Sequence, residues 1–376
     1  MEMLSTEDSV VITGIGAVTA YGVGLNALRK GLCDGRSAIA SAGPLLPGVE
    51  DRAVGLVRDL SEFQRKFPQI RPPLPFPLTR MALLAAKEAI EDSNLPPAAR
   101  PSTGIFLNRN QGATAVVVKA AEPMFREGPQ RMSPLAFSQS VQNAPLGAIS
   151  IHLGLHGPHI LTVGGGAFML GFEALRSGEA DAILCGGIDE VEATTLPAAE
   201  ALGYLAKPGQ EGAIKGEGAV MCLLERAHHA RQRGAQVYAE LASVAVGSDS
   251  ALEKIEEADI ACWGRPTGAG IAQLLREVLN DAGVHIDDVA LMVGTANGQP
   301  AIDDAESEAA AILGLSRTLT TTLKKHIGEG AGMAAAASIA WAADSIRRTS
   351  LKRNRAPVAL VFNMENHALY FGAVLR

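Results

Sequence analysis

The segment Val10-Val11-Ile12-Thr13 begins the first regular element of the chain, and Gly14-Ile15-Gly16 follows it directly. An unbroken run of β-branched residues is typical of a strand buried on both faces. The pair Gly14 and Gly16 could begin a dinucleotide-binding fingerprint, but Thr19 stands where the third glycine belongs. The segment therefore predicts a buried strand with a tight exit at the glycines, and it gives little reason to expect a nucleotide site.

Outward from this strand, strand-like and helix-like segments alternate through both halves of the chain. Each half also has a glycine-bounded, alanine-rich helix, at Gly164–Leu175 and at Gly328–Ala342. This repetition predicts an α/β fold of two similar halves packed as one body, 1–235 and 236–376. The predicted strands are Val10–Thr13, Gly104–Leu107, Ile160–Val163, Ala182–Cys185, Gly218–Leu224, Val289–Gly294, Leu319–Thr322, Pro357–Phe362 and Ala368–Leu375. The predicted helices include Thr79–Asn94, 112–126, 143–153, Ala167–Ser177, 226–234, Asp303–Leu313 and Ala331–Arg347.

Composition excludes several classes of function. The chain has 376 residues, 47% of them hydrophobic, and a net charge of −7. A net negative charge argues against binding to nucleic acid, and against a polybasic protein surface that would bind a membrane. The most apolar helical stretch, Gly330–Ala343, is too short to cross a bilayer, and the acidic N-terminus lacks the features of a signal peptide. We therefore expect a cytoplasmic protein without a membrane span.

The cysteines and histidines predict no metal site. Cys33, Cys185, Cys222 and Cys262 are scattered and form no C-x-x-C pair, so neither a zinc ribbon nor a disulfide scaffold is indicated. Cys185 and Cys222 lie in apolar strands and are interpreted as buried packing residues. We expect neither a metal nor a cofactor.

Five ordered segments resemble one known family. They are VVITGIGAVTAYG (10–22), GPQRMSP (128–134), the stretch from Gln142 to Pro158, GEADAILCGGIDE (178–190) and KGEGAVMCLLERAHHARQRGAQVYAEL (215–241). In order and spacing they are similar to the β-ketoacyl-ACP synthases, the thiolase-fold condensing enzymes. The resemblance implies a five-layered αβαβα fold of two pseudo-repeated halves that is usually dimeric. It also implies a Cys-His-His site that condenses an acyl thioester with malonyl-ACP.

The positions that match the catalytic groups of the family carry other residues. The nucleophilic cysteine belongs in the turn after Ile160–Val163, where this sequence has Gly164-Gly165-Gly166, and which glycine replaces it stays open. Thr295 matches the first histidine and Glu329 the second. The family's lysine is kept as Lys324. Without a cysteine or an imidazole pair, the resemblance implies a degenerate site.

Two further readings concern the polar residues around this site. His326 and Glu329 are three residues apart and could form an acid/base pair on one helical turn, although a loop histidine that hydrogen-bonds backbone is the favoured interpretation. Glu329 could instead be an anion that stabilises a helix N-terminus. Lys324 is expected to form a buried structural ion pair with Glu306 or Asp303.

A basic run near the C-terminus contrasts with the acidic chain. Since acyl carrier proteins are acidic, the run is a candidate docking surface for one. Cations that simply follow a helix C-terminus are the alternative interpretation. The run consists of Arg347, Arg348, Lys352, Arg353 and Arg355.

Three hypotheses of function follow. The first is a catalytically inactive β-ketoacyl synthase homologue, resembling a chain-length factor, that pairs with an active ketosynthase and acyl carrier protein in type II polyketide, polyene or fatty-acid biosynthesis. The second is a single-chain thioester hydrolase or malonyl-ACP decarboxylase that uses Glu329 and His326, with an oxyanion hole at the Gly164–Gly166 amides. The third is a homodimeric scaffold that binds acyl groups or acyl carrier protein.

Overall fold

The structure is a computed structural model of the whole chain. It describes residues 9–71, 74, 76–111, 113–162, 165–207, 210–249, 266–315, 318–350, 357–365 and 369–376. The predictions for Val163, Gly164, Cys262 and the 351–356 segment therefore lie outside the described residues.

Strands and helices alternate as the sequence predicts. The strands are β1 Val10–Thr19, β2 Gly22–Val23, β3 Ala40–Ser41, β4 Ala53–Val54, β5 Gly104–Arg109, β6 His159–Thr162, β7 Ala182–Asp189, β8 Gly218–Arg226, β9 Ala239–Ser248, β10 Val289–Gly294, β11 Leu319–Thr322, β12 Val358–Glu365 and β13 Leu369–Leu375. The α-helices are α1 Leu25–Cys33, α2 Glu62–Lys66, α3 Pro77–Asp92, α4 Thr114–Glu127, α5 Pro134–Gln139, α6 Ala144–Leu153, α7 Gly166–Arg176, α8 Leu196–Ala201, α9 Ala227–Gln232, α10 Gly268–Asp281, α11 Pro300–Leu313, α12 Lys324–Ile327 and α13 Ala334–Ser350.

The main sheet contains the same arrangement twice. The first half has the strand order β6-β5-β7-β8-β1, and the second half has β11-β10-β12-β13-β9. In both halves the first three strands are parallel and the last two are antiparallel to their neighbours. The two halves join where β1 pairs with β9. The repeat predicted from the sequence is therefore present, while a boundary at 235/236 stays a prediction.

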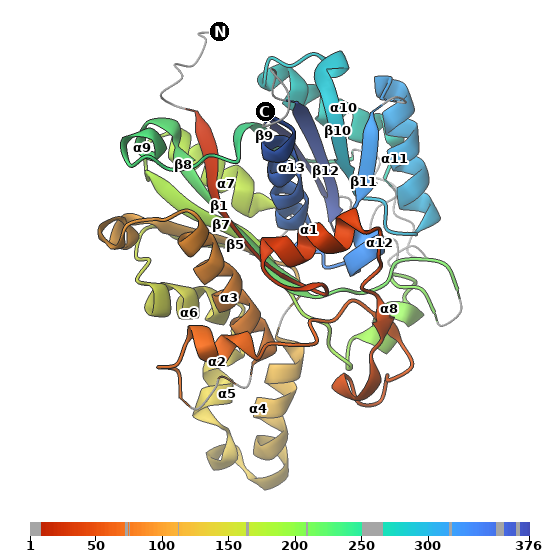
Figure 1. Cartoon of the computed structure of the whole chain (residues 1–376). Coiled ribbons are helices and arrows are strands. Elements are labelled where there is room, and N and C mark those ends of the chain that lie inside the picture. The colour runs from red at the N-terminus through yellow and green to blue at the C-terminus, as the bar shows by residue number, and fades with distance from the viewer. Residues whose placement is uncertain are drawn as a thin grey trace.

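Helices and strands form five layers (Figure 1). Helix α3, with α6 against it, covers the outer face of the first half, and α10 with α11 covers that of the second. Helices α7 and α13 lie between, and each contacts strands of both halves. One hydrophobic core surrounds this central pair and two others lie under the outer helices. The fold is the thiolase-like αβαβα architecture.

The predicted exit from the first strand at Gly14 and Gly16 is wrong, because β1 continues to Thr19. The glycines serve close packing instead. A Cβ on Gly14 would lie 2.2 Å from the carbonyl oxygen of Ala89, and one on Gly16 would lie 2.0 Å from that of Ala85. Only a residue without a side chain lets α3 approach β1 this closely.

Three other elements differ from expectation. Strand β7 runs through Gly186-Gly187, since both residues pair with β8. Strand β9, which follows the predicted seam, has no counterpart among the predicted strands. Helix α3 begins with Pro77, and Thr79 lies inside it, buried, with its hydroxyl donating to Gln139. Proline fits the first helical position because it has no N–H to leave unpaired.

Helices α4 and α5 project from the lower end of the molecule in Figure 1, and we call them the arm. Of the residues of α4, only Ala120 is buried. Large apolar side chains are exposed along the arm, with Phe125 at 81%. The others on the arm are Val117, Val118, Leu135 and Phe137. Among the described residues, no helix combines the length and the apolar character needed to cross a membrane.

Candidate functional site

The turn between β6 and α7 is where the family's nucleophile belongs. Gly165 precedes the helix with a φ of 73°, a left-handed conformation that favours glycine. A Cβ on Gly165 would lie 2.8 Å from Cδ2 of Phe371, whereas one on Gly166 would first meet Cβ of Thr162 at 3.3 Å. The buried ring of Phe371 therefore occupies the space in front of Gly165.

Thr295 lies at the end of β10 and is fully buried. Its hydroxyl oxygen accepts from Lys324 Nζ at 2.9 Å and from the Met364 N–H at 2.9 Å, and it contacts Asn363 Oδ1 at 3.4 Å. These partners use the hydrogen-bonding capacity of a hydroxyl. Thr295 thus joins β10 to β12 and α12 as a structural crosslink.

Lys324 pairs with Glu329, not with Glu306 or Asp303 as the sequence suggested. The distance from Lys324 Nζ to Glu329 Oε2 is 3.0 Å, and the two side chains are 5% and 16% exposed. The same carboxylate oxygen accepts from Asn297 Nδ2 at 2.9 Å. Lys324 Nζ also donates to the Thr295 hydroxyl and to the Met364 carbonyl, so the ammonium has three polar partners within the chain.

Asp303 and Glu306 hold backbone instead. Glu306 accepts from the N–H groups of Thr295 and Ala296, and burial raises the pKa of its carboxyl. Asp303 accepts from the N–H of Asn297 and pairs with Lys325 at 2.7 Å. Both carboxylates shape the loop after β10.

His326 and Glu329 do not form the acid/base pair considered above. The His326 imidazole lies 3.4 Å from the carbonyl oxygen of Arg36. The Glu329 carboxylate is bound by Lys324 and Asn297, and its second oxygen, Oε1, is buried without a hydrogen-bond partner. Glu329 also pairs through its backbone with Lys215, so it is not the cap of α13. Within the described residues, the three matched positions carry neither a nucleophile nor an imidazole.

The basic run is partly engaged within the chain. The Arg347 guanidinium stacks over the ring of Tyr238 at 4.4 Å and donates to Gln236. Arg348 pairs with the buried Asp344 at 2.9 Å and stacks over Trp341. Lys352, Arg353 and Arg355 lie outside the described residues. Of the run, two members are thus placed, and both have partners on their own chain.

A buried charged cluster at the ends of β5 and β7 has no counterpart in the sequence predictions. Arg109 pairs with Glu190 at 3.1 Å, and Lys215 pairs with Asp189 at 2.8 Å. Burial raises the pKa of Glu190 to about 8 and that of Glu217 to about 7. The sequence signal that could have predicted this cluster is the acidic run at 189–192, which follows an apolar strand. Functional sites of α/β sheets lie at the carboxyl ends of parallel strands, where such a run would be placed.

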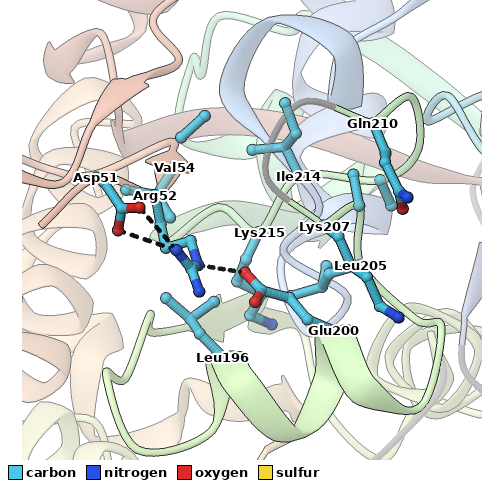
Figure 2. Close-up of a pocket in the computed structure, with 13 residues that line it drawn as sticks. Asp51, Arg52, Val54, Leu196, Glu200, Leu205, Lys207, Gln210, Ile214 and Lys215 are labelled. Atoms are coloured by element: carbon cyan, nitrogen blue, oxygen red, sulfur yellow. Dashed lines mark hydrogen bonds and ion pairs between the residues drawn. The ribbon is translucent and has the colours of Figure 1, made fainter. Parts of the chain in front are cut away.

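A pocket of about 150 Å³ lies beside the degenerate site (Figure 2). Arg52 crosses it, held by Glu200 at 2.8 Å and by Asp51 at 2.9 Å. Ile214 in its wall accepts the Glu329 N–H at 2.6 Å. Lys207 and Gln210 complete the wall. Among the described residues, no group of three or more potential ligands is placed to hold a metal ion.

Comparison with known proteins identifies the family. Models of the β-ketoacyl synthase N-terminal and C-terminal domains match residues 7–230 and 238–355. The chain therefore belongs to the β-ketoacyl synthase family. It is 26% identical over 365 residues to 3-oxoacyl-(acyl-carrier-protein) synthase 2 of Staphylococcus aureus (strain COL), covering 85% of this chain and 82% of the relative.

Solved structures agree with this assignment at the level of the fold. The ishigamide ketosynthase/chain length factor superposes with a TM-score of 0.82 at 22% identity, covering 98% of both chains. A type II polyketide synthase acyl-carrier protein in complex with its ketosynthase gives a TM-score of 0.79 at 20% identity, covering 98% of this chain and 99% of that one.

Proposed function

We propose that the chain is a catalytically inactive β-ketoacyl synthase homologue that acts, like a chain-length factor, as the partner of an active ketosynthase. The pathway would be type II polyketide, polyene or fatty-acid biosynthesis. The observation that carries the proposal is the state of Lys324. Thr295 and Glu329, which stand where imidazoles belong, bind its ammonium, so a former reaction centre has become a buried crosslink.

The turn between β6 and α7 adds a second argument. Condensation needs a thiolate on the turn before α7 to take the acyl group. This chain offers glycine there, with the ring of Phe371 against Gly165. An acyl group would find neither an acceptor atom nor the space for one at that residue.

The surface supports a partnership. Strand β6 is the edge of the sheet in the first half, and an edge strand offers unpaired backbone groups. The arm carries several exposed apolar side chains, and Ile151 of α6 is 74% exposed. Exposed apolar patches rimmed by polar residues mark protein-binding sites. Two structural neighbours, a ketosynthase/chain length factor and a ketosynthase in complex with an acyl-carrier protein, fit a ketosynthase and an acyl carrier protein as partners.

The proposal places the protein in the cytoplasm. Cys33, Cys185 and Cys222 are free thiols, as is usual in a reducing compartment. The basic run from Arg347 to Arg355 stays a candidate docking surface for the acyl carrier protein, with Lys352, Arg353 and Arg355 as the members to test first.

The test is co-purification of the tagged chain with a cysteine-bearing synthase from a neighbouring gene, followed by native mass spectrometry and a condensation assay with malonyl-ACP. We expect a one-to-one heterodimer whose activity persists in His326→Gln. This variant separates the hypotheses well because, among the described residues, the His326 imidazole hydrogen-bonds to the Arg36 carbonyl alone. Glu329→Gln serves as a second variant after its fold has been checked, since it leaves Lys324 buried with a weaker partner.

Thioester hydrolysis or malonyl-ACP decarboxylation by the purified single chain, lost in His326→Gln, would contradict the proposal and favour the single-chain enzyme. A stable homodimer that binds acyl carrier protein and ignores the synthase would favour the scaffold.

A further inference from the structure

The arm is attached to the body by polar contacts at both of its ends, and we call this place the root. At the first end, Glu192 Oε1 accepts the N–H of Ala115 in α4 at 3.0 Å. At the second end, Arg109 donates to the carbonyl oxygen of Gln142 at 3.2 Å. Arg109 in turn pairs with Glu190 at 3.1 Å. Buried charges from the ends of β5 and β7 thus hold a segment whose outer face is exposed and apolar.

The root contains buried polar atoms that lack partners. They are Glu192 Oε2, Gln111 Oε1 and Asn110 Nδ2, within the part of the chain that the structure describes. Glu192 is only 4% exposed. Its carboxyl group accepts the Ala115 N–H and interacts with the Thr114 hydroxyl, while Oε2 has no hydrogen-bond partner of good geometry. Such an atom costs about 1–3 kcal/mol, and more when it is charged. Two of the three are acceptors, so the root lacks donors above all.

The root also gathers several ionisable groups. Four carboxyl groups gather there, and two cations face them, Arg109 and Lys215. Burial raises the pKa of Glu190, Glu192 and Glu217, with neighbouring carboxylates adding to the effect for each. The carboxyl groups are Asp189, Glu190, Glu192 and Glu217. The ionised form of these carboxyl groups is therefore disfavoured in the free chain, and an added donor or cation would stabilise it.

We propose that an arginine side chain of the partner ketosynthase enters the root and donates to Glu192 when the two subunits associate. This inference rests on the proposed function for the identity of the partner. A guanidinium offers five N–H donors and stays charged when it is taken out of water. Arginine is also enriched at interfaces between proteins.

The arm can admit such a side chain. Helix α4 has only Ala120 buried, so few contacts resist its displacement. Docking of the exposed side chains of the arm, Phe125 among them, would shift α4 and expose Glu192 Oε2 to the incoming group. The apolar surface of the arm would then contribute most of the binding energy, and the polar contact at the root would contribute specificity for the partner.

The experiment compares the wild-type chain with Glu192→Gln by sedimentation velocity against the cysteine-bearing synthase. Glutamine keeps the carbonyl that accepts the Ala115 N–H but removes the charge. Glu277→Gln is the matched control, because Glu277 is an exposed carboxylate on α10, far from the arm in Figure 1. We expect Glu192→Gln to weaken association at least tenfold, and the control to stay within twofold of wild type.

Thermal unfolding of the single chain gives the second readout. Since Glu192 leaves an unpaired oxygen in the free chain, Glu192→Gln is expected to melt at the same temperature as wild type or higher. A purely structural role would lower the melting temperature instead, and that result would overturn the inference.

Unchanged affinity for the synthase in Glu192→Gln would also overturn the inference while leaving the proposed function intact. Failure of the wild-type chain to bind the synthase would contradict the proposed function, and with it the partner named for the root. In that case self-association of the chain is compared for wild type and Glu192→Gln. Equal self-association would show that a second copy of this chain does not donate a side chain to Glu192 either.

Discussion

At the scale of single residues, the geometry of the turn between β6 and α7 predicts how a restored cysteine would affect stability. We expect Gly165→Cys to lower the free energy of unfolding by about 2 kcal/mol or more, because a side chain at positive φ is strained and its Cβ would lie 2.8 Å from the Phe371 ring. Gly166→Cys, whose nearest neighbour is Thr162 at 3.3 Å, should lose less. Urea unfolding of the two variants measures the difference.

The same pair of variants tests the loss of chemistry. Neither thiol should yield condensation with malonyl-ACP, since Thr295 and Glu329 provide no imidazole to assist decarboxylation. Equal stability of the two variants would contradict the role given to Phe371. Condensation by either one would contradict the inactive site.

Also at this scale, the buried carboxyl of Glu190 predicts a pH dependence. Burial raises its pKa to about 8, so the folded chain keeps a proton that the unfolded chain has lost. The group therefore stabilises the fold most below its unfolded pKa, and this contribution declines by up to about 1.4 kcal/mol per pH unit as the pH rises to 8. Urea unfolding at pH 5.5, 6.5 and 7.5 should show the decline.

The variant Glu190→Gln should reduce that slope without abolishing it, because an amide does not titrate, whereas Glu217, whose pKa burial raises to about 7, still does. Its absolute stability is a poorer readout, since an amide replaces the carboxyl group that Arg109 contacts. The exposed Glu173, on α7, is the control, and Glu173→Gln should keep the wild-type slope. An unchanged slope in Glu190→Gln would show that another group titrates.

At the scale of elements, the contact between β1 and α3 depends on Gly16. A methyl group there would lie 2.0 Å from the carbonyl oxygen of Ala85, which is backbone and cannot turn aside. We expect Gly16→Ala to lower the free energy of unfolding by about 3 kcal/mol, at the upper end of overpacking costs. Gly147→Ala in α6 is the control, because nothing lies within 4 Å of its added Cβ. Chemical denaturation should show little loss, or a gain, for the control.

The elements that the sequence predicted well share a strong local signal. Strands β10 and β11 have the predicted bounds, because each is a compact apolar or β-branched run between polar turns. The predicted end of β1 was wrong because the sequence alone does not distinguish a glycine in a turn from a glycine that lets a helix pack closely on a strand. Strand β9 was missed because many of its residues are small, so its apolar pattern is weak although its burial partly alternates.

At the scale of the molecule, the arm predicts how the chain associates. Phe125→Glu should leave the melting temperature of the free chain unchanged, because the side chain is 81% exposed, and should weaken binding to the synthase at least tenfold. Leu319→Glu is the control: Leu319 is 69% exposed but lies on β11, at the opposite edge of the sheet. Analytical ultracentrifugation compares the two. Equal effects, or none, would move the interface away from the arm.

The candidate site could be predicted only in part. The loss of cysteine and histidines is a matter of residue identity, so the sequence reveals it directly. The partner of Lys324 depends on geometry. Glu306 and Asp303 lie on α11, earlier in the chain than Lys324, but their carboxylates accept hydrogen bonds from the loop after β10. The charged root depends on two strands far apart in sequence, and no local pattern joins Arg109 to Glu190.

The shared central layer has a consequence for biogenesis. Helix α13 packs on β7 and β8 of the first half, and the core around it extends from Val10 to Leu375. At about 5–20 residues per second, the ribosome needs on the order of ten seconds to add the second half. Throughout that interval α7 covers the inner face of the nascent first sheet without α13. The chain is therefore exposed to aggregation and to chaperones until its final strand emerges, and translation speed becomes one determinant of its yield.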